Sequence, residues 1–289
     1  MKRYIGISLL LIVVLIVAGC GGNKRIVKER STPGETGVNP VGGPKDDPVS
    51  KIIFFDDFES DQGWTTTGFW HRQVNDSGIV NKGLIYYNLP KGDTSGGNIP
   101  SAYDGNYCYW YGETDTGNYS RTPEGVISKG ANSGTLTSPA ITIPEKTNPV
   151  LTFMTWYEVE SVTPNEFDQM IVKISDDDGA SFKELYRLNP VENPYHDGKK
   201  SSIAYTSGGF DLPGKWVEVG KLSLSEYQGK TIKIQFEFST KDDAFNYFRG
   251  WFIDLVKIVN SDEPVLKVQG MQSIRSYPKN PPQRREISF

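Results

Sequence analysis

Asp254 makes the strongest chemical demand in this chain, because it is the one acidic residue in the apolar run Phe248–Val259, written FRGWFIDLVKIV. A run so rich in aromatic and β-branched residues is typical of a buried strand. A carboxylate in such a strand costs free energy unless it is paired with a cation or binds a metal. The sequence therefore gives two hypotheses for Asp254, an ion pair with Arg249 or Lys257, or a metal site.

Glu158 and Glu160 are a second pair of acids that could do chemistry, since alternation places both on one face of the strand predicted at Val150–Glu160. Glycosidases use two carboxylates, but these normally come from different strands across a cleft. Solvated acids at a strand end are the favoured interpretation. The two histidines, His71 and His196, stand in no metalloprotease or serine hydrolase pattern. The sequence thus favours a protein that is not an enzyme, with a hydrolase as the alternative.

The N-terminus predicts export and lipid attachment. Lys2 and Arg3 precede the apolar run Ile5–Ala18, which is short for a membrane span and typical of a signal peptide. The run leads into Val17-Ala18-Gly19-Cys20, which resembles the lipobox of bacterial lipoproteins, where the cysteine takes a diacylglycerol. Residues 1–19 are thus predicted to be a signal peptide, and Cys20 the lipidation site that anchors the protein in a membrane of the cell envelope. An uncleaved N-terminal anchor is the alternative.

Composition divides the rest of the chain into three parts. Residues 20–50 are rich in Pro and Gly and lack aromatic residues, so they predict a flexible tether. Residues 51–261 carry the predicted folded domain, and residues 262–289 a C-terminal tail. With Cys20 lipidated, Cys108 has no disulfide partner and is predicted to be a buried, inert thiol. The formal charge of -4 argues against a nucleic-acid partner.

The folded part predicts an all-β sandwich. Aromatic residues make up 12% of the chain, and 30 Gly and 18 Pro supply turns, as is typical of β proteins. No helical pattern exceeds a turn such as Ser225–Gly229. Apolar or alternating segments predict ten strands, at Ile52–Glu59, Gly83–Leu89, Tyr107–Tyr111, Thr135–Ile143, Val150–Glu160, Gln169–Ser175, Phe182–Leu188, Trp216–Leu224, Thr231–Ser239 and Phe248–Val259.

The turn between two of these strands has a pattern of its own. Ser175, Asp177, Gly179 and Phe182 match the Asp-box S-x-D-x-G-x-x-(W/F). A single copy predicts a hairpin whose aspartate caps backbone groups of the turn, which is a structural role.

Taken in order, several short motifs resemble those of MAM-type jelly-roll domains, and most closely the bacterial MAM-like modules that accompany secreted peptidases. The resemblance covers about Ile53–Val259 and implies an all-β, concanavalin-like jelly roll with a non-catalytic binding role. Leu255 stands where the family often has a second Asp, and the disulfides of animal members are absent. The motifs are Asp57-Phe58-Glu59, Gly63-Trp64, Gly105-Asn106-Tyr107-Cys108-Tyr109, Gly134-Thr135-Leu136-Thr137-Ser138-Pro139, Leu151–Glu158 and Gly250-Trp251-Phe252-Ile253-Asp254.

The resemblance also implies a structural cation that joins the first and last strands. Alternation along the first strand places Asp57 and Glu59 on one face, and the last strand supplies Asp254. Asp104 precedes a predicted turn and could add a ligand. Oxygen ligands suit Ca²⁺, so calcium is the predicted cofactor at these four residues.

Aromatic residues in loops give the third hypothesis, in which flat rings contact a glycan or a protein partner. Packing in the core and at its rim is the alternative role for each ring. The favoured interpretation is a cell-envelope lipoprotein that displays a non-catalytic jelly roll for adhesion to an extracellular protein or glycan. The alternatives are a carbohydrate-binding module of a polysaccharide-uptake system and a hydrolase accessory subunit. The candidate rings are Tyr195, Tyr205 and Tyr247, with Tyr86, Tyr87 and Phe248 beside them.

Overall fold

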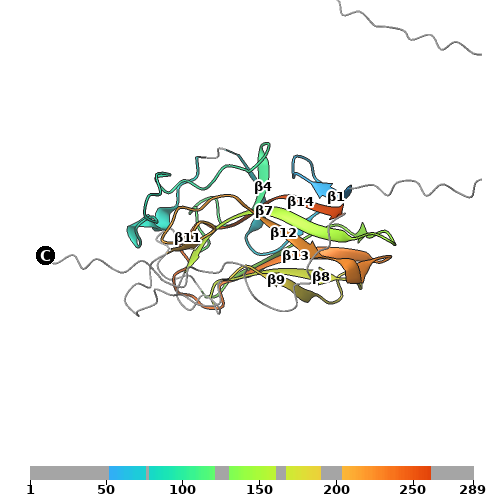
Figure 1. The fold of residues 1–289 in the computed structure, drawn as a ribbon. Helices are drawn as coiled ribbons and strands as arrows, with labels where there is room; N and C mark the ends of the chain where they lie inside the picture. The colour runs from blue at the N-terminus through green and yellow to red at the C-terminus, as the bar shows by residue number, and fades with distance from the viewer. Residues whose placement is uncertain (1–51, 76–77, 121–129, 161–166, 190–203, 262–289) are drawn as a thin grey trace, which may run out of the picture. The chain divides into compact units, whose positions relative to one another are not determined.

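The computed structural model describes residues 52–75, 78–120, 130–160, 167–189 and 204–261 (Figure 1). The predicted signal peptide (1–19), tether (20–50) and tail (262–289) lie outside these ranges, as do Cys20, Tyr195 and His196.

The fold is a sandwich of two antiparallel sheets, so the predicted all-β jelly-roll class is confirmed. The larger sheet has the strand order β11-β10-β7-β14-β4-β3, with β1 paired to β14 and β12 paired to β7. Its strands are β1 (Ile52–Asp56), β3 (Trp70–Val74), β4 (Tyr107–Tyr111), β7 (Pro149–Glu160), β10 (Ala204–Thr206), β11 (Gly209–Phe210), β12 (Val217–Ser223) and β14 (Gly250–Asn260).

The smaller sheet has the order β2-β5-β13-β8-β9, and β6 also pairs with β13. In Figure 1 its labelled strands β8, β9 and β13 form the layer below β7 and β14. Two 3₁₀ turns are described, η1 (Lys82–Ile85) and η2 (Ser225–Tyr227). The strands are β2 (Thr65–Thr66), β5 (Ser133–Thr137), β6 (Ile141–Thr142), β8 (Gln169–Ser175), β9 (Lys183–Arg187) and β13 (Thr231–Ser239).

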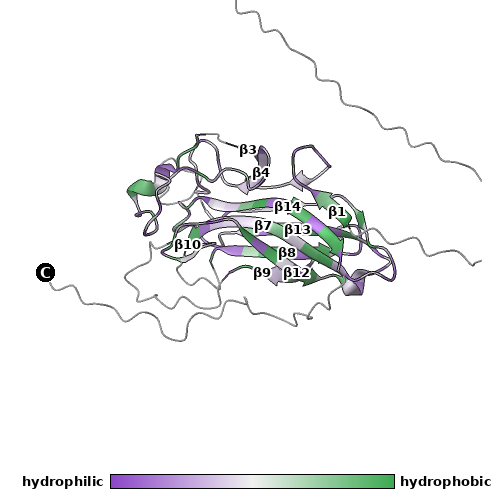
Figure 2. Cartoon of the chain, turned by 45° about the horizontal axis from the view of Figure 1, so that its top comes forward, coloured by the Kyte–Doolittle hydropathy of each residue, from purple (hydrophilic) through white to green (hydrophobic). Residues whose placement is uncertain are grey.

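Apolar and polar side chains alternate along β13, so one face of the strand packs in the core and the other faces the surface. Its Ile and Phe side chains are buried in the core, whereas Lys233 and Glu237 point outward and are partly exposed. Glu237 forms an ion pair with Lys173 of β8 at 2.5 Å. Figure 2 shows the same mixture of hydrophobic and hydrophilic residues along the strands. This confirms the predicted half-buried strand at Thr231–Ser239.

β14 is buried on both of its faces, which explains its nearly unbroken apolar sequence. Trp251 and Ile253 belong to the main core between the sheets. Phe252 points to the other face of the larger sheet, where it stacks on Trp110 with ring centroids 5.3 Å apart. Ile79, Ile99 and Ala102 pack against this second cluster. The segment before β4 therefore covers the outer face of the larger sheet, and positions the site described below.

Three local predictions differ from the structure. The strand predicted at Gly83–Leu89 is the 3₁₀ turn η1 followed by a turn, with Asn81 capping it by accepting the Gly83 N–H. The segment Thr135–Ile143 is split into β5 and β6 around Pro139, because proline cannot donate to a ladder. The first strand ends at Asp56, because Phe58 has a positive φ of 62°.

Two other predictions are confirmed. Cys108 is a free, buried cysteine, and burial raises the pKa of its thiol. In the Asp-box hairpin, the Asp177 carboxylate accepts the backbone N–H of Ser181 at 2.9 Å and the Ser175 hydroxyl at 2.6 Å. The motif is thus a structural brace between β8 and β9.

Candidate functional site

Asp254 is fully buried, and backbone amides satisfy its carboxylate. Oδ2 accepts the N–H groups of Tyr103 at 2.8 Å and Asp104 at 3.2 Å, and Oδ1 accepts the N–H of Leu255 at 2.7 Å. Burial raises the pKa of Asp254 to about 7, although the three backbone hydrogen bonds act in the opposite direction and lower it. The alternative of an ion pair between Asp254 and Arg249 or Lys257 is therefore wrong. A buried carboxylate can be satisfied by N–H donors alone.

The other predicted metal ligands have related roles. Glu59 accepts the backbone N–H groups of Asn106 at 2.7 Å and Tyr107 at 2.8 Å, whereas Asp57 accepts the N–H of Glu59 at 3.2 Å. β1 and β14 are neighbours, as predicted. However, the described residues contain no group of three or more His, Cys, Asp or Glu side chains able to hold a metal ion. Binding of Ca²⁺ by Asp57, Glu59, Asp104 and Asp254 stays a prediction.

The sequence analysis missed the buried acid of the first strand. Asp56, rather than Asp57, turns inward, and its Oδ2 accepts the indole N–H of Trp64 at 2.7 Å. Its Oδ1 accepts the N–H of Phe58 at 2.8 Å, which fixes the chain where β1 ends. Alternation places Asp56 on the same face as Phe58, which is also buried, and opposite Asp57.

Glu59 and Asp254 together hold the loop of residues 101–107 at four of its backbone amides. This loop presents Tyr103, whose side chain is 48% exposed. The Tyr103 ring contacts Trp216 edge-on, with centroids 6.0 Å apart. Trp216 is half-buried, and its indole N–H donates to the Ser101 carbonyl at 3.0 Å. We call Tyr103 and Trp216 the aromatic pair.

The aromatic pair lies beside polar groups that face solvent. Trp216 packs against the covered cluster on the outer face of the larger sheet, so its ring is supported from below. The neighbouring exposed residues in the chain are Ser101, Asp104, Lys215 and Glu218. Sequence reasoning did not select the pair. The available signal was a tyrosine in a polar loop, between Pro100 and Gly105.

Glu158 forms part of a buried ionic network rather than a hydrolytic pair. Its two carboxylate oxygens accept from Arg249, at 3.1 Å from Nε and 2.5 Å from Nη2, and Oε1 also accepts the Tyr87 hydroxyl at 2.7 Å. Arg249 Nη2 also contacts Asp93 at 2.5 Å. Burial alone would raise the pKa of Asp93. Hydrogen bonds from Ser95 and the charge of Arg249 outweigh burial, so the pKa of Asp93 is lowered. The network ties the segment around Asp93 to β7.

The interpretation of Glu158 and Glu160 as solvated acids is wrong, because both are buried. Two of the tyrosines proposed to contact a ligand are also buried. Tyr205 and Tyr247 are 3% and 4% exposed, so neither face is open to a ligand. The Tyr205 ring packs against Tyr157 and the Tyr247 ring against Tyr87. Their role is core packing, which was the stated alternative. Tyr87 and Phe248 are buried in the same core.

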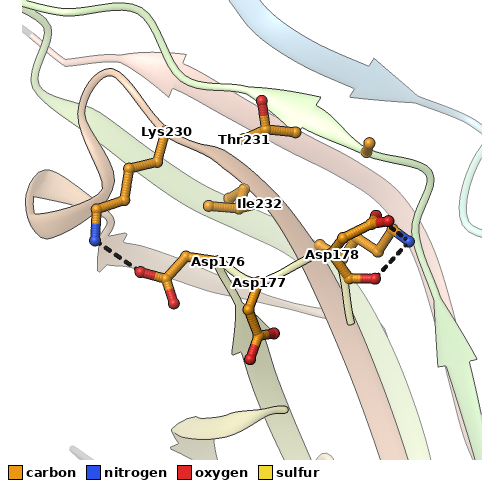
Figure 3. Close-up of a pocket in the computed structure, with 8 residues that line it drawn as sticks. Asp176, Asp177, Asp178, Lys230, Thr231 and Ile232 are labelled. Atoms are coloured by element: carbon orange, nitrogen blue, oxygen red, sulfur yellow. Dashed lines mark hydrogen bonds and ion pairs between the residues drawn. The ribbon is translucent and has the colours of Figure 1, made fainter. Parts of the chain in front are cut away.

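A shallow hollow of about 490 Å³ lies beside the Asp-box hairpin (Figure 3). Four of its five charged side chains are paired, since Lys230 contacts Asp176 at 2.7 Å and Lys233 contacts Asp178 at 2.7 Å. In Figure 3 the Asp177 carboxylate points away from Ile232. Its lining contains no aromatic residue, so the hollow is less suited to a ligand than the aromatic pair.

No protein-family model matches the chain, and no curated protein does. Solved structures similar to it include the K1 cleaved adhesin domain of Lys-gingipain from Porphyromonas gingivalis W83. That match has 16% identity and a TM-score of 0.39, and covers 72% of this chain and 98% of the other. Another is TmCBM61 in complex with β-1,4-galactotriose, with 11% identity, a TM-score of 0.34, and coverage of 69% and 90%. A third is the CBM22-1 xylan-binding domain of Paenibacillus barcinonensis Xyn10C, with 13% identity, a TM-score of 0.33, and coverage of 73% and 94%.

Proposed function

We propose that the protein is a cell-envelope lipoprotein that displays a non-catalytic, MAM-like β-sandwich and binds glycans at the aromatic pair. The observation that carries the proposal is the half-exposed Tyr103 ring on a loop anchored by two carboxylates. Binding sites combine aromatic surface with a few placed polar groups. The exposed Ser101 and Asp104 supply hydroxyl and carboxylate partners next to the ring.

Rigidity of the loop supports this role. Ordering a loop upon binding costs free energy, so a surface that is already fixed binds more tightly. Asp254 fixes the backbone at Tyr103 itself, and Glu59 fixes the far end of the same loop. Trp216 has its indole N–H bonded to Ser101, which holds the second ring against the first. The pair therefore offers a preformed apolar face for a sugar ring.

The non-catalytic part of the proposal is supported by the state of Glu158. This carboxylate is fully buried and bonded to Arg249 and Tyr87, so it is not placed to act as an acid or a nucleophile on a surface substrate. Glu160 is also buried. A catalytic carboxylate must lie within hydrogen-bonding reach of the substrate.

Membrane attachment is proposed from the sequence around Cys20 alone. Within the described ranges no helix is long and apolar enough to cross a membrane. Substituting Cys20→Ala is expected to abolish incorporation of labelled fatty acid and to release the protein from the membrane fraction. Unchanged labelling of the C20A variant would remove the lipoprotein part of the proposal without affecting the binding part.

The binding proposal is tested on a glycan array, followed by calorimetric titration of the strongest hit with three proteins. Tyr103→Ala is expected to weaken binding at least about tenfold, which corresponds to about 1.4 kcal/mol. Tyr103→Phe keeps the ring and is expected to bind nearly as well as the natural protein. Phe55→Ala is the matched control, since Phe55 is 43% exposed on β1. Absence of any glycan hit, or equal affinities for Tyr103→Ala and Phe55→Ala, would overturn the proposal.

A further inference from the structure

Glu160 and Asp168 form a buried acidic pair with oxygen atoms that lack partners. Glu160 ends β7 and is 1% exposed, and Asp168 directly precedes β8 and is 0% exposed. Glu160 Oε2 and Asp168 Oδ1 are buried and accept no hydrogen bond in the structure. A buried carboxylate without a partner costs several kcal/mol if it is charged, as a rough estimate. Something must therefore neutralise this pair.

The charges that act on the pair from described residues are negative. Burial raises the pKa of Glu160 most, followed by the charges of Asp168 and Asp242. Burial also raises the pKa of Asp168, and the charge of Asp242 adds to it, while the Tyr119 hydroxyl and the backbone N–H of Glu160 lower it. That hydroxyl donates to Asp168 Oδ2 at 2.5 Å. Arg249, a buried cation, is already bonded to Glu158 and Asp93.

The two acids adjoin different sheets of the sandwich, since Glu160 ends β7 and Asp168 precedes β8. β7 is in the larger sheet and β8 is in the smaller one. Asp168 is fixed from several directions, because Asn189 donates to its backbone carbonyl and also accepts the N–H of Met170 at 2.7 Å. A group bound to both free oxygens would therefore connect the two layers at this end of the sandwich.

We propose that Glu160 and Asp168 bind a hard divalent cation, Ca²⁺, through Oε2 and Oδ1, and that the ion ties the two sheets together. Calcium takes about six to eight oxygen ligands, among them carboxylates, backbone carbonyls and water. The free donors here are carboxylate oxygens, without sulfur or imidazole, which favours Ca²⁺ over Zn²⁺. The two carboxylates balance the charge of the ion. This site is separate from Asp57, Glu59, Asp104 and Asp254.

Thermal unfolding of the full-length protein in detergent, in Ca²⁺ and in chelator, tests the site. At a Ca²⁺ concentration of 100 times the Kd, the melting temperature is expected to rise by about 5–10 °C. Glu160→Gln and Asp168→Asn are each expected to remove this rise. Glu160→Gln should melt in chelator no lower than the natural protein, because it replaces a buried acid by a neutral side chain of similar shape, so a lost response is not a failure to fold.

Two further measurements separate this site from its competitors. Glu59→Gln is expected to keep the Ca²⁺ response, so a response lost in Glu59→Gln but kept in Glu160→Gln would overturn the proposal. Tb³⁺ luminescence excited through nearby tyrosine, displaced by Ca²⁺ and absent in Asp168→Asn, is the expected direct signal. The natural protein could instead fail to respond to Ca²⁺ and become more stable as pH falls from 8 to 5. That result would show that protons neutralise the pair, and it would also overturn the proposal.

Discussion

Replacing Arg249 with methionine removes the central charge of the buried network while keeping much of the side chain's volume. Arg249 is 2% exposed and contacts the carboxylates of Glu158 and Asp93, each at 2.5 Å. It also donates to the Asn98 carbonyl at 3.0 Å. The substitution leaves the buried Glu158 and Asp93 without a cation. It also removes the main attachment of the segment around Asp93 to β7.

The expected loss follows from the state of these two acids. Breaking a buried ion pair by removing one partner costs about 3–5 kcal/mol. Glu158 keeps the Tyr87 hydroxyl at 2.7 Å, and Asp93 keeps the Ser95 N–H at 2.8 Å, so the loss should stay in this range although two acids are affected. Each kcal/mol lowers the melting temperature of a domain this size by about 2–4 °C, so Arg249→Met should melt about 10 °C lower.

Urea unfolding measures the loss directly, and Arg187→Met is the matched control. Arg187 forms a more exposed ion pair with Glu184 at 2.8 Å, which should contribute less than about 1 kcal/mol. Adding Glu158→Gln to Arg249→Met should recover part of the loss. A loss in Arg249→Met no larger than in Arg187→Met would refute the assignment of this network as an anchor.

Two further outcomes are expected. In Asp254→Asn, the free energy of unfolding should lose a pH-dependent part. The folded pKa of Asp254, about 7, lies above that of an unfolded aspartate, so the contribution of Asp254 to stability is fully present below about pH 4 and falls as pH rises to 7. Urea titrations at pH 4, 5.5 and 7 measure the free energy of unfolding of both proteins. If the two free energies change with pH in parallel, the prediction is wrong. Asp177→Ala should lower the melting temperature more than Asp178→Ala, because Asp177 accepts hydrogen bonds from Ser175 and Ser181. These bonds lower the pKa of Asp177, so the stability they contribute is lost as pH falls. Equal melting temperatures for the two variants would contradict the role of Asp177 as a brace of the hairpin.

Strand positions could be predicted wherever one face of a strand is buried. The bounds of Thr231–Ser239 are predicted as observed, because a half-buried strand alternates with period two. Gly83–Leu89 was predicted wrongly as a strand. Its residues Leu84 and Tyr87 pack with the main core from the 3₁₀ turn η1 and the segment after it, so their spacing does not follow a strand period.

The partners of buried acids could not be predicted, because backbone amides leave no signal in a sequence. Asp254 was correctly identified as a carboxylate that needs a partner, but that partner is the backbone of a loop some 150 residues earlier in the chain. The sequence predicts a solvated acid at Glu160, because Glu160 ends a strand. Nothing in the sequence around it shows that the end of β7 is enclosed.

These acids divide into two classes by what surrounds them. Asp56, Glu59 and Asp254 each accept at least two hydrogen bonds, so their charge is distributed over donors that the fold itself provides. Glu160 and Asp168 instead each keep one buried oxygen without a donor, although the other oxygen of Asp168 accepts the Tyr119 hydroxyl. The family resemblance implies a metal at Glu59 and Asp254, which belong to the first class. It is the second class that has unused coordinating atoms, since an oxygen already accepting N–H groups has less capacity left for a cation.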